Sequence, residues 1–370
     1  MPLVDTTIST DITSTNNHKL LKPKYTSLAM ASPTLQIIIK SRPHDAILPA
    51  EVFTSRTVPP PSPADLAPDE ILIETLYLSL DPVMRDWLNA SNGIRETTPG
   101  EVMSGPLLAR VLASRSAALP VGTLVHGFAP WASVSAIPAA GLEDASAFLP
   151  AGLPVTDLLG VLGFTGLTAY FAMLRVGRPL PGETVVVSTA AGATGSVAAQ
   201  LAKIRGARVV GIAGGPQKGR WLRELGVDEV LDYKDPGYED AFAKAVAGGI
   251  DLYFDNVGGR TLELAIENIK ESGRIIIVGA TGDYNTSNPH RIKSLFPLAP
   301  KSATVHGFNI FKHLKDAAEA RAELSQWLQD GTLKRTQTVI KGGLEAAPQG
   351  LADMFKGKNT GKMLVEVKAD

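Results

Sequence analysis

The sequence predicts an α/β fold in which a doubly wound parallel sheet is joined to a second, β-rich domain. Three observations support this prediction. A length of 370 residues is ample for two domains. Short strand-like runs broken by proline and glycine fill residues 34–157, whereas apolar strands alternate with amphipathic helices over residues 158–324. Residues 325–370 return to the first pattern, so we expect them to rejoin the β-rich domain.

The segment before these domains, residues 1–33, is rich in serine and threonine and lacks the apolar core of a signal peptide. We expect a disordered tail. A role in organelle targeting stays open, because Lys19, Lys22 and Lys24 make part of the tail basic.

In the β-rich domain, the first strands are expected at Leu35–Lys40, Glu70–Leu76 and Gly105–Leu112. Residues 58–63, Val-Pro-Pro-Pro-Ser-Pro, can form neither a helix nor a central strand and predict an extended loop. Short strands at this close spacing indicate a barrel-like domain.

The second domain alternates continuous apolar strands with helices, which is typical of a parallel sheet covered on both faces. The expected strands are Thr184–Ser188, Arg208–Ala213, Glu229–Tyr233, Ile250–Asp255 and Arg274–Gly279. The expected helices are Thr194–Ile204, Gln217–Leu225, Tyr238–Val246, Arg260–Asn268 and Asp316–Gln329. The C-terminal elements are expected to be strands Thr336–Ile340 and Met363–Val367 around a helix Leu344–Phe355.

The amino-acid composition excludes several classes of partner and of metal site. A net charge of −1 favours neither nucleic acid nor an anionic membrane, so we expect a small-molecule partner. The absence of cysteine excludes disulfides, thiolate zinc sites, iron–sulfur clusters and a cysteine nucleophile. The six histidines show no metal-type spacing, so we expect no metal. No apolar run approaches the ~20 residues that span a bilayer, and we expect a cytoplasmic protein.

A glycine-rich turn gives the sharpest local signal. The run Ala190-Ala191-Gly192-Ala193-Thr194-Gly195 directly follows a predicted strand and opens a predicted helix. It has the G-x-G-x-x-G frame with Ala190 in the first position. Gly192 would let the backbone approach a pyrophosphate, and Gly195 would let the helix pack closely on the strand. The free N–H groups of the helix start would then bind the pyrophosphate of a dinucleotide.

The residues after the second strand favour NADP over NAD. An NAD site usually has a carboxylate there for the ribose hydroxyls, but Gly211–Gly215 contains no acid. Lys218 and Arg220 follow at once, and Tyr233 ends the third strand. Cations without a carboxylate suit a 2′-phosphate.

These motifs resemble the zinc-independent branch of the medium-chain dehydrogenase/reductase superfamily, in particular the prostaglandin reductase and plant alkenal double-bond reductase group. The matching stretches are Asp81–Arg85, Gly163–Tyr170, Ala190–Val197, Asp251–Gly259, Gly279–Asn285 and Gly357–Lys362. The resemblance implies a Rossmann domain over 158–324, a split GroES-like catalytic domain over 34–157 and 325–370, NADPH, and a homodimer. It also implies a small apolar enone or enal as substrate.

The resemblance also assigns site residues. Those expected to bind the cofactor are Ala190, Gly192, Ala193, Thr194, Gly195, Ser196, Val197, Gly214, Lys218, Tyr233, Asn256, Gly279, Ala280, Thr281, Phe308 and Asn359. Tyr284 falls on the active-site tyrosine of the group. Hydride addition to the β-carbon of an enone leaves an enolate whose oxygen needs a hydrogen-bond donor, and a tyrosine hydroxyl can supply it.

The substrate pocket is expected to include Val83, Met84 and Phe164, with Phe308 as a further wall. The group often has tyrosine where this chain has Val83. The more apolar wall predicts a bulkier hydrophobic enone, such as a polyketide-like one.

Two alternatives stay open. A zinc-free quinone reductase would share the cofactor site, although the Asp81–Arg85 and Gly282–Asn285 stretches favour the alkene reductase. A non-catalytic NADPH-binding protein would keep the fold without turnover.

Overall fold

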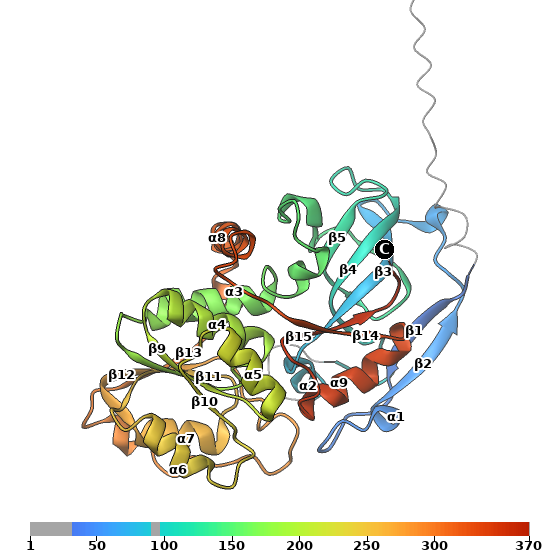
Figure 1. Ribbon diagram of the computed structural model, residues 1–370. Coiled ribbons are helices and arrows are strands. Elements are labelled where there is room, and N and C mark those ends of the chain that lie inside the picture. Colours follow the sequence, from blue (N-terminus) through green and yellow to red (C-terminus); the bar gives the residue numbers. More distant parts are fainter. Residues whose placement is uncertain (1–31, 90–96, 370) are drawn as a thin grey trace, which may run out of the picture.

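Two separate β-sheets organise the chain, one parallel and one mainly antiparallel (Figure 1). The computed structural model describes residues 32–89 and 97–369. The predicted tail, residues 1–33, therefore lies outside the described residues except for its last two positions. The predicted fold class, a doubly wound parallel sheet beside a β-rich domain, is confirmed.

The parallel sheet has the strand order β10-β9-β8-β11-β12-β13, and all neighbouring strands are parallel. With β8 counted as the first strand, this is the 3-2-1-4-5-6 order of a Rossmann fold. The strands are β8 (Thr184–Val187), β9 (Arg208–Ile212), β10 (Glu229–Leu231), β11 (Ile250–Asp255), β12 (Ile269–Ile277) and β13 (Thr304–Gly307). The sequence predicts the first five. It does not predict β13, because this exposed edge strand has only four residues and no apolar run.

Helices cover both faces of this sheet (Figure 1). One hydrophobic core joins the inner side chains of α3, α4 and α8 to β8, and another joins those of α6 and α7 to β11 and β12. The helices are α3 (Phe164–Tyr170), α4 (Ala193–Ile204), α5 (Pro216–Glu224), α6 (Tyr238–Ala245), α7 (Gly259–Glu267) and α8 (Ala317–Gln329). Within the described ranges, no helix has the length and apolarity needed to cross a membrane.

The second sheet follows the order β14-β15-β3-β4-β5-β7, and β6 also pairs with β3. Its strands are β3 (Glu70–Leu80), β4 (Ser104–Ser114), β5 (Leu124–Pro130), β6 (Val134–Pro138), β7 (Leu142–Asp144), β14 (Gln337–Lys341) and β15 (Lys362–Glu366). A separate hairpin pairs β1 (Thr34–Ile39) with β2 (Phe53–Val58). The other α-helices in the described ranges are α1 (Pro49–Val52), α2 (Val83–Trp87) and α9 (Ala347–Phe355). The predicted loop over 58–63 is shorter than expected, because Val58 ends β2 and Pro63 opens a short 3-10 turn.

The C-terminal strand β15 brings the end of the chain back into the N-terminal sheet. It lies antiparallel to β3, with Met363 opposite Leu80, and its first four residues are buried. Gly361, just before β15, forms a parallel bridge with Gly192 at the start of α4, so the chain there contacts both the parallel-sheet domain and the β-rich domain. The predicted boundary after residue 324 falls inside α8, which continues to Gln329.

Candidate functional site

A groove of about 430 Å³ lies at the carboxyl ends of β8, β9 and β11. Its other wall comes from the β-rich domain, at Leu80–Pro82 and in the segment from Met354 to Met363. In open parallel sheets, ligands bind where the strand order reverses, which here is between β8 and β11. The groove therefore occupies the position expected for a dinucleotide.

The glycine-rich turn forms the floor of this groove. Residues 191–195 line it, whereas Ala190, Ser196 and Val197 are buried beneath it. A Cβ atom at Gly195 would lie 2.2 Å from the carbonyl oxygen of Thr189, so only glycine lets α4 pack this closely on the strand end. Gly192 caps α4 without any side-chain bond to the first N–H groups. Those N–H groups are left to bind an anion, which fits a pyrophosphate.

One end of the groove carries positive charge. Gly214, Lys218 and Tyr233 line it, and residues 211–215 at the end of β9 include no acid, although the carboxylate of Asp232 accepts a hydrogen bond from the N–H of Gly215 at 2.9 Å. Burial lowers the pKa of Lys218, and the neighbouring Lys234 lowers it further. Two ammonium groups whose fields overlap favour a dianionic group between or beside them. These residues fit a 2′-phosphate. Arg220, which the sequence also suggested, is not part of the lining.

The opposite end lies where β11 finishes. Asn256 lines the groove, and its side-chain amide donates to the carbonyl oxygen of Ser188 at 2.6 Å. Thr281 also lines the groove. The hydrogen bond from its N–H to the carbonyl oxygen of Asn256, at 3.0 Å, holds it next to the end of β11. Gly279 and Ala280 lie behind this turn and do not line the groove. The sequence did not identify the buried Asp255, whose carboxylate accepts from the N–H groups of residues 257 and 258 and so shapes the turn.

Tyr284 lies beside the same turn but lines neither this groove nor the cavity described below. Its hydroxyl accepts a hydrogen bond from the N–H of Ala280 at 3.2 Å. Burial raises the pKa of this phenol. Phe308 likewise lines neither space and stacks on His313, with ring centroids 5.2 Å apart. Asn359 does line the groove, and its amide donates to the carbonyl oxygen of Gly361 at 2.9 Å.

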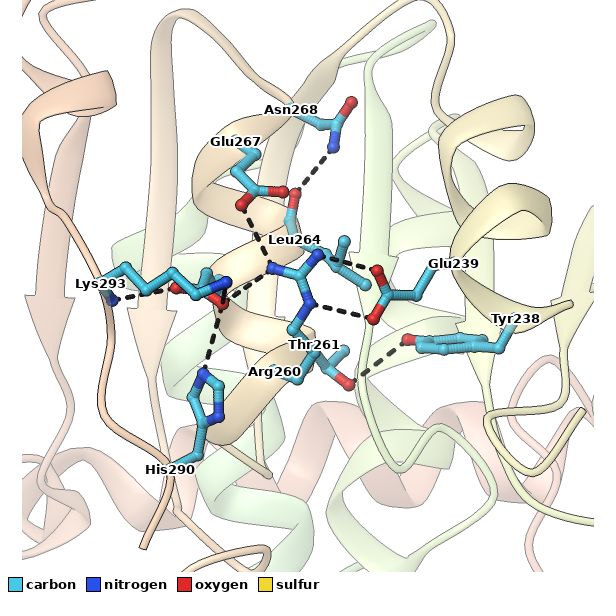
Figure 2. Close-up of polar contacts among 10 residues, drawn as sticks. Tyr238, Glu239, Arg260, Thr261, Leu264, Glu267, Asn268, His290 and Lys293 are labelled. Atoms are coloured by element: carbon cyan, nitrogen blue, oxygen red, sulfur yellow. Dashed lines mark hydrogen bonds and ion pairs between the residues drawn. The ribbon is translucent and has the colours of Figure 1, made fainter. Parts of the chain in front are cut away.

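The loop after this turn is fastened to α7 by the buried carboxylate of Glu263. Figure 2 labels its partners Arg260, His290 and Lys293. Glu263 accepts hydrogen bonds from the N–H of Lys293 at 2.9 Å and from Arg260 at 2.7 Å, and it lies 3.3 Å from the His290 ring. Arg260 also contacts Glu239 on α6. These bonds hold the pKa of Glu263 at about 2, with the Lys293 N–H as the largest cause. The network holds the loop at residues 290–293 against α7 and α6, and the N–H of His290 also donates to the carboxylate of Asp283 at 3.3 Å.

A second cavity of about 350 Å³ adjoins the groove, and the two share Asp81, Thr165 and Lys362 in their linings. Phe164, expected in the substrate pocket, lines this cavity next to Phe128, with ring centroids 5.4 Å apart. Val83 and Met84 line neither space. Met84 is fully buried against Gly105 in the core of the β-rich domain, and Val83 packs on that core.

Two charged residues at the junction were not assigned by sequence reasoning. Lys362 is 3% exposed and pairs with the carboxylate of Asp81, which also accepts from the Ser79 hydroxyl at 2.5 Å. Both residues belong to quoted stretches, Asp81–Arg85 and Gly357–Lys362, so the motifs were visible although the pairing was not.

Comparison with known proteins identifies the family. Residues 35–145 match the model of an N-terminal domain of oxidoreductases, and residues 193–329 match that of zinc-binding dehydrogenases. Bovine prostaglandin reductase 1 is 37% identical over 308 residues, covering 80% of this chain and 89% of the relative. The chain belongs to the medium-chain dehydrogenase/reductase family.

Other members of the family agree with the predicted cofactor. A Bacillus subtilis member with the provisional name NADP-dependent oxidoreductase YfmJ is 37% identical, covering 91% of this chain and 99% of that protein. The structure of CurA from Vibrio vulnificus in complex with NADPH matches with a TM-score of 0.81 and 33% identity, covering 91% and 100%. Although one family model is named for zinc, residues 32–89 and 97–369 contain no group of three or more His, Cys, Asp or Glu that could hold a metal.

Proposed function

We propose that the protein uses NADPH to reduce the carbon–carbon double bond of α,β-unsaturated ketones and aldehydes. The observation that carries this proposal is that the cofactor groove and the second cavity lie next to each other. A groove with phosphate-binding features at Gly192 and Lys218 meets a cavity walled by Phe128 and Phe164. A polar cofactor and an apolar acceptor can therefore lie end to end.

Bound NADPH would supply the hydride that adds to the β-carbon. The glycine turn would hold the pyrophosphate, Lys218 and Tyr233 the 2′-phosphate, and Asn256 with the Thr281 turn the nicotinamide half. In this proposal the turn carrying Gly279 and Ala280, together with Asn359, orients the cofactor. The resemblance implies Tyr284 as one hydrogen-bond donor to the enolate oxygen. Its bond to Ala280 would have to open for that role.

The test follows NADPH oxidation with enals, enones and quinones, in parallel with NADH, and identifies the products by mass spectrometry. We expect a saturated ketone or aldehyde and a preference for NADPH. Quinone turnover without alkene reduction would instead support a quinone reductase, and tight NADPH binding without any turnover a non-catalytic protein. A Tyr284→Phe variant as active as the parent would remove that hydroxyl from the reaction.

The proposal includes a cytoplasmic homodimer. β13 forms the open edge of the parallel sheet, and Val305 on it is 46% exposed. Open strand edges pair readily with another chain, so the edge of a second copy is the partner that we propose. Val305→Lys should shift the sedimentation of the protein from dimer to monomer, and a parent protein that sediments as a monomer would contradict the dimer.

A further inference from the structure

The junction between groove and cavity holds a buried ammonium group. Lys362 lines both spaces, as does its partner Asp81, although the side chain of Lys362 is only 4% exposed. Charged groups are rarely buried to this extent unless they have a specific partner or task. The burial of the Lys362–Asp81 ion pair at this junction therefore indicates a functional role.

We propose that Lys362 is a catalytic residue, the hydrogen-bond donor that stabilises the enolate oxygen of an acceptor whose apolar body fills the second cavity. This inference rests on the proposed function and names a different donor from Tyr284. Tyr284 lines neither space, whereas Lys362 lines both.

The donor count of Lys362 supports this role. An ammonium group has three N–H donors. In the described part of the chain, Lys362 donates to the carbonyl oxygen of Leu80 at 3.1 Å and to the carboxylate of Asp81. One donor is left at a position where both spaces open. A third acceptor supplied by a substrate would complete its hydrogen bonds.

Asp81 acts as a positioning residue. Burial lowers the pKa of Lys362, and the adjacent carboxylate of Asp81 opposes that shift. Asp81 is fixed in turn by the Ser79 hydroxyl and by the antiparallel pairing of β15 with β3. The carboxylate thus favours the charged form of the amine and holds it at the junction by their ion pair. A preorganised charge in a buried site stabilises a developing anion without reorganisation of solvent.

The lining of the second cavity determines which groups the substrate can carry beyond its carbonyl group. Part of the cavity wall consists of two aromatic rings and several aliphatic side chains, namely Phe128, Phe164, Leu142, Leu158, Leu167 and Leu314. The rest of the wall carries the charged or titratable side chains of Asp81, His126, Glu143, Arg321 and Lys362. The apolar part of this wall fits the ring or branched chain of an enone that enters with its carbonyl group towards Lys362.

The electron and proton balance is simple. When hydride adds to the β-carbon, the π electrons of the alkene shift to form the enolate, and its negative oxygen pairs with the Lys362 ammonium. Water then protonates the α-carbon as the carbonyl re-forms. The proton comes from water and not from Lys362, so the net change is the uptake of one hydride and one proton by the alkene.

The first experiment measures turnover and NADPH binding in Lys362→Met. We expect kcat with an enone to fall by about 10²–10³-fold, as for the loss of other oxyanion donors, with NADPH affinity almost unchanged. Lys362→Met leaves Asp81 unpaired, so the double variant with Asp81→Asn protects against misfolding. Lys358→Met is the matched control, because Lys358 lies in the same run but is 60% exposed and outside both linings. Its activity should stay within about twofold of the parent.

The second experiment needs no turnover. 4-Nitrophenol resembles an enolate and absorbs visible light when ionised, so its ionisation can be titrated on the protein saturated with NADP⁺. In the parent and in Lys358→Met, the bound phenol should ionise at a lower pH than in water, and this shift should vanish in Lys362→Met. A purely structural lysine would not move this signal.

The outcomes separate the two proposals. A parent enzyme that reduces no enone contradicts the proposed function. A parent that reduces enones, with a folded Lys362→Met variant of equal kcat, overturns the role of Lys362. Absence of any Lys362-dependent change in nitrophenol ionisation, including absence of binding, counts equally against it.

Discussion

Replacing Gly195 by alanine tests the close packing of α4 on β8 that creates the phosphate-binding turn. The added Cβ would lie 2.2 Å from the carbonyl oxygen of Thr189 and 2.9 Å from the Cα of Ala190. Ordinary contacts begin near 3.4 Å, so the helix and the turn must separate by about 1.2 Å (3.4 − 2.2). Both contacts are with backbone atoms, which cannot rotate away. Overpacking of this kind costs about 1–3 kcal/mol, and we expect the upper end.

The expected result is a lower melting temperature together with weaker NADPH binding. A loss of about 3 kcal/mol corresponds to roughly 6 °C or more in Tm for a domain of this size. Moving the first N–H groups of α4 by about 1 Å stretches any bond to a pyrophosphate beyond hydrogen-bond range, so we expect Kd to rise at least about tenfold. Scanning calorimetry and titration calorimetry measure the two effects.

The matched control is Gly219→Ala in the adjacent helix α5. There the nearest atom to a new Cβ is the flexible end of Arg223 at 3.5 Å, an ordinary contact. Alanine inside a helix is favoured over glycine by about 0.5–1 kcal/mol, so Tm should hold or rise. If Gly195→Ala kept the Tm and Kd of the parent, or if both variants behaved alike, the packing argument for the turn would be wrong.

Three further predictions concern charged groups. Lys218→Ala should raise the Kd for NADPH by about 10–100-fold in titration calorimetry and leave that for NADH unchanged, because only NADPH carries the 2′-phosphate; equal losses for both would refute the phosphate site. Arg335→Met should lower the free energy of unfolding in urea by about 3 kcal/mol, because Arg335 donates to the fully buried Asp157 at 2.5 Å; adding Asp157→Asn should recover most of the loss. Glu263, with a folded pKa of about 2 below its ordinary 4.5, contributes stability that is fully present above pH 4.5 and lost as the pH falls towards 2. Glu263→Gln should therefore flatten the acid limb of stability against pH, and an unchanged limb would exclude this carboxylate as its cause.

The elements that the sequence predicted best are those with strong local signals. The strand at Thr184–Val187 and the helix that follows it appear because a continuous apolar run and a glycine turn each act over a few residues. The exposed strand at Thr304–Gly307 was missed for the opposite reason. Its hydrogen bonds to β12 define it, and its four side chains are all exposed.

Only some of the predicted site residues line the groove. Whether a side chain faces a cavity depends on tertiary packing, which local sequence patterns do not determine. Lys218 and Asn256 follow strand ends whose direction the parallel sheet fixes, and both line the groove. Met84 lies only three residues from Asp81, yet the turn of α2 directs it into the core against Gly105. Tyr284 sits in a loop, and the backbone bond from Ala280 decides where its hydroxyl lies. No spacing rule contains that information.

The pairing of Lys362 with Asp81 shows where sequence reasoning stops and why the structure matters for the chemistry. The two residues are 281 positions apart, and they meet because β15 lies antiparallel to β3 with Met363 opposite Leu80. A shift of one residue in that register would turn Lys362 to the other face of the sheet and leave Asp81 without its cation. The return of the C-terminal strand to the N-terminal sheet therefore does more than complete a fold. It places a buried positive charge where the cofactor groove opens into the cavity lined by Phe128 and Phe164, the position at which the proposed reaction develops its negative charge.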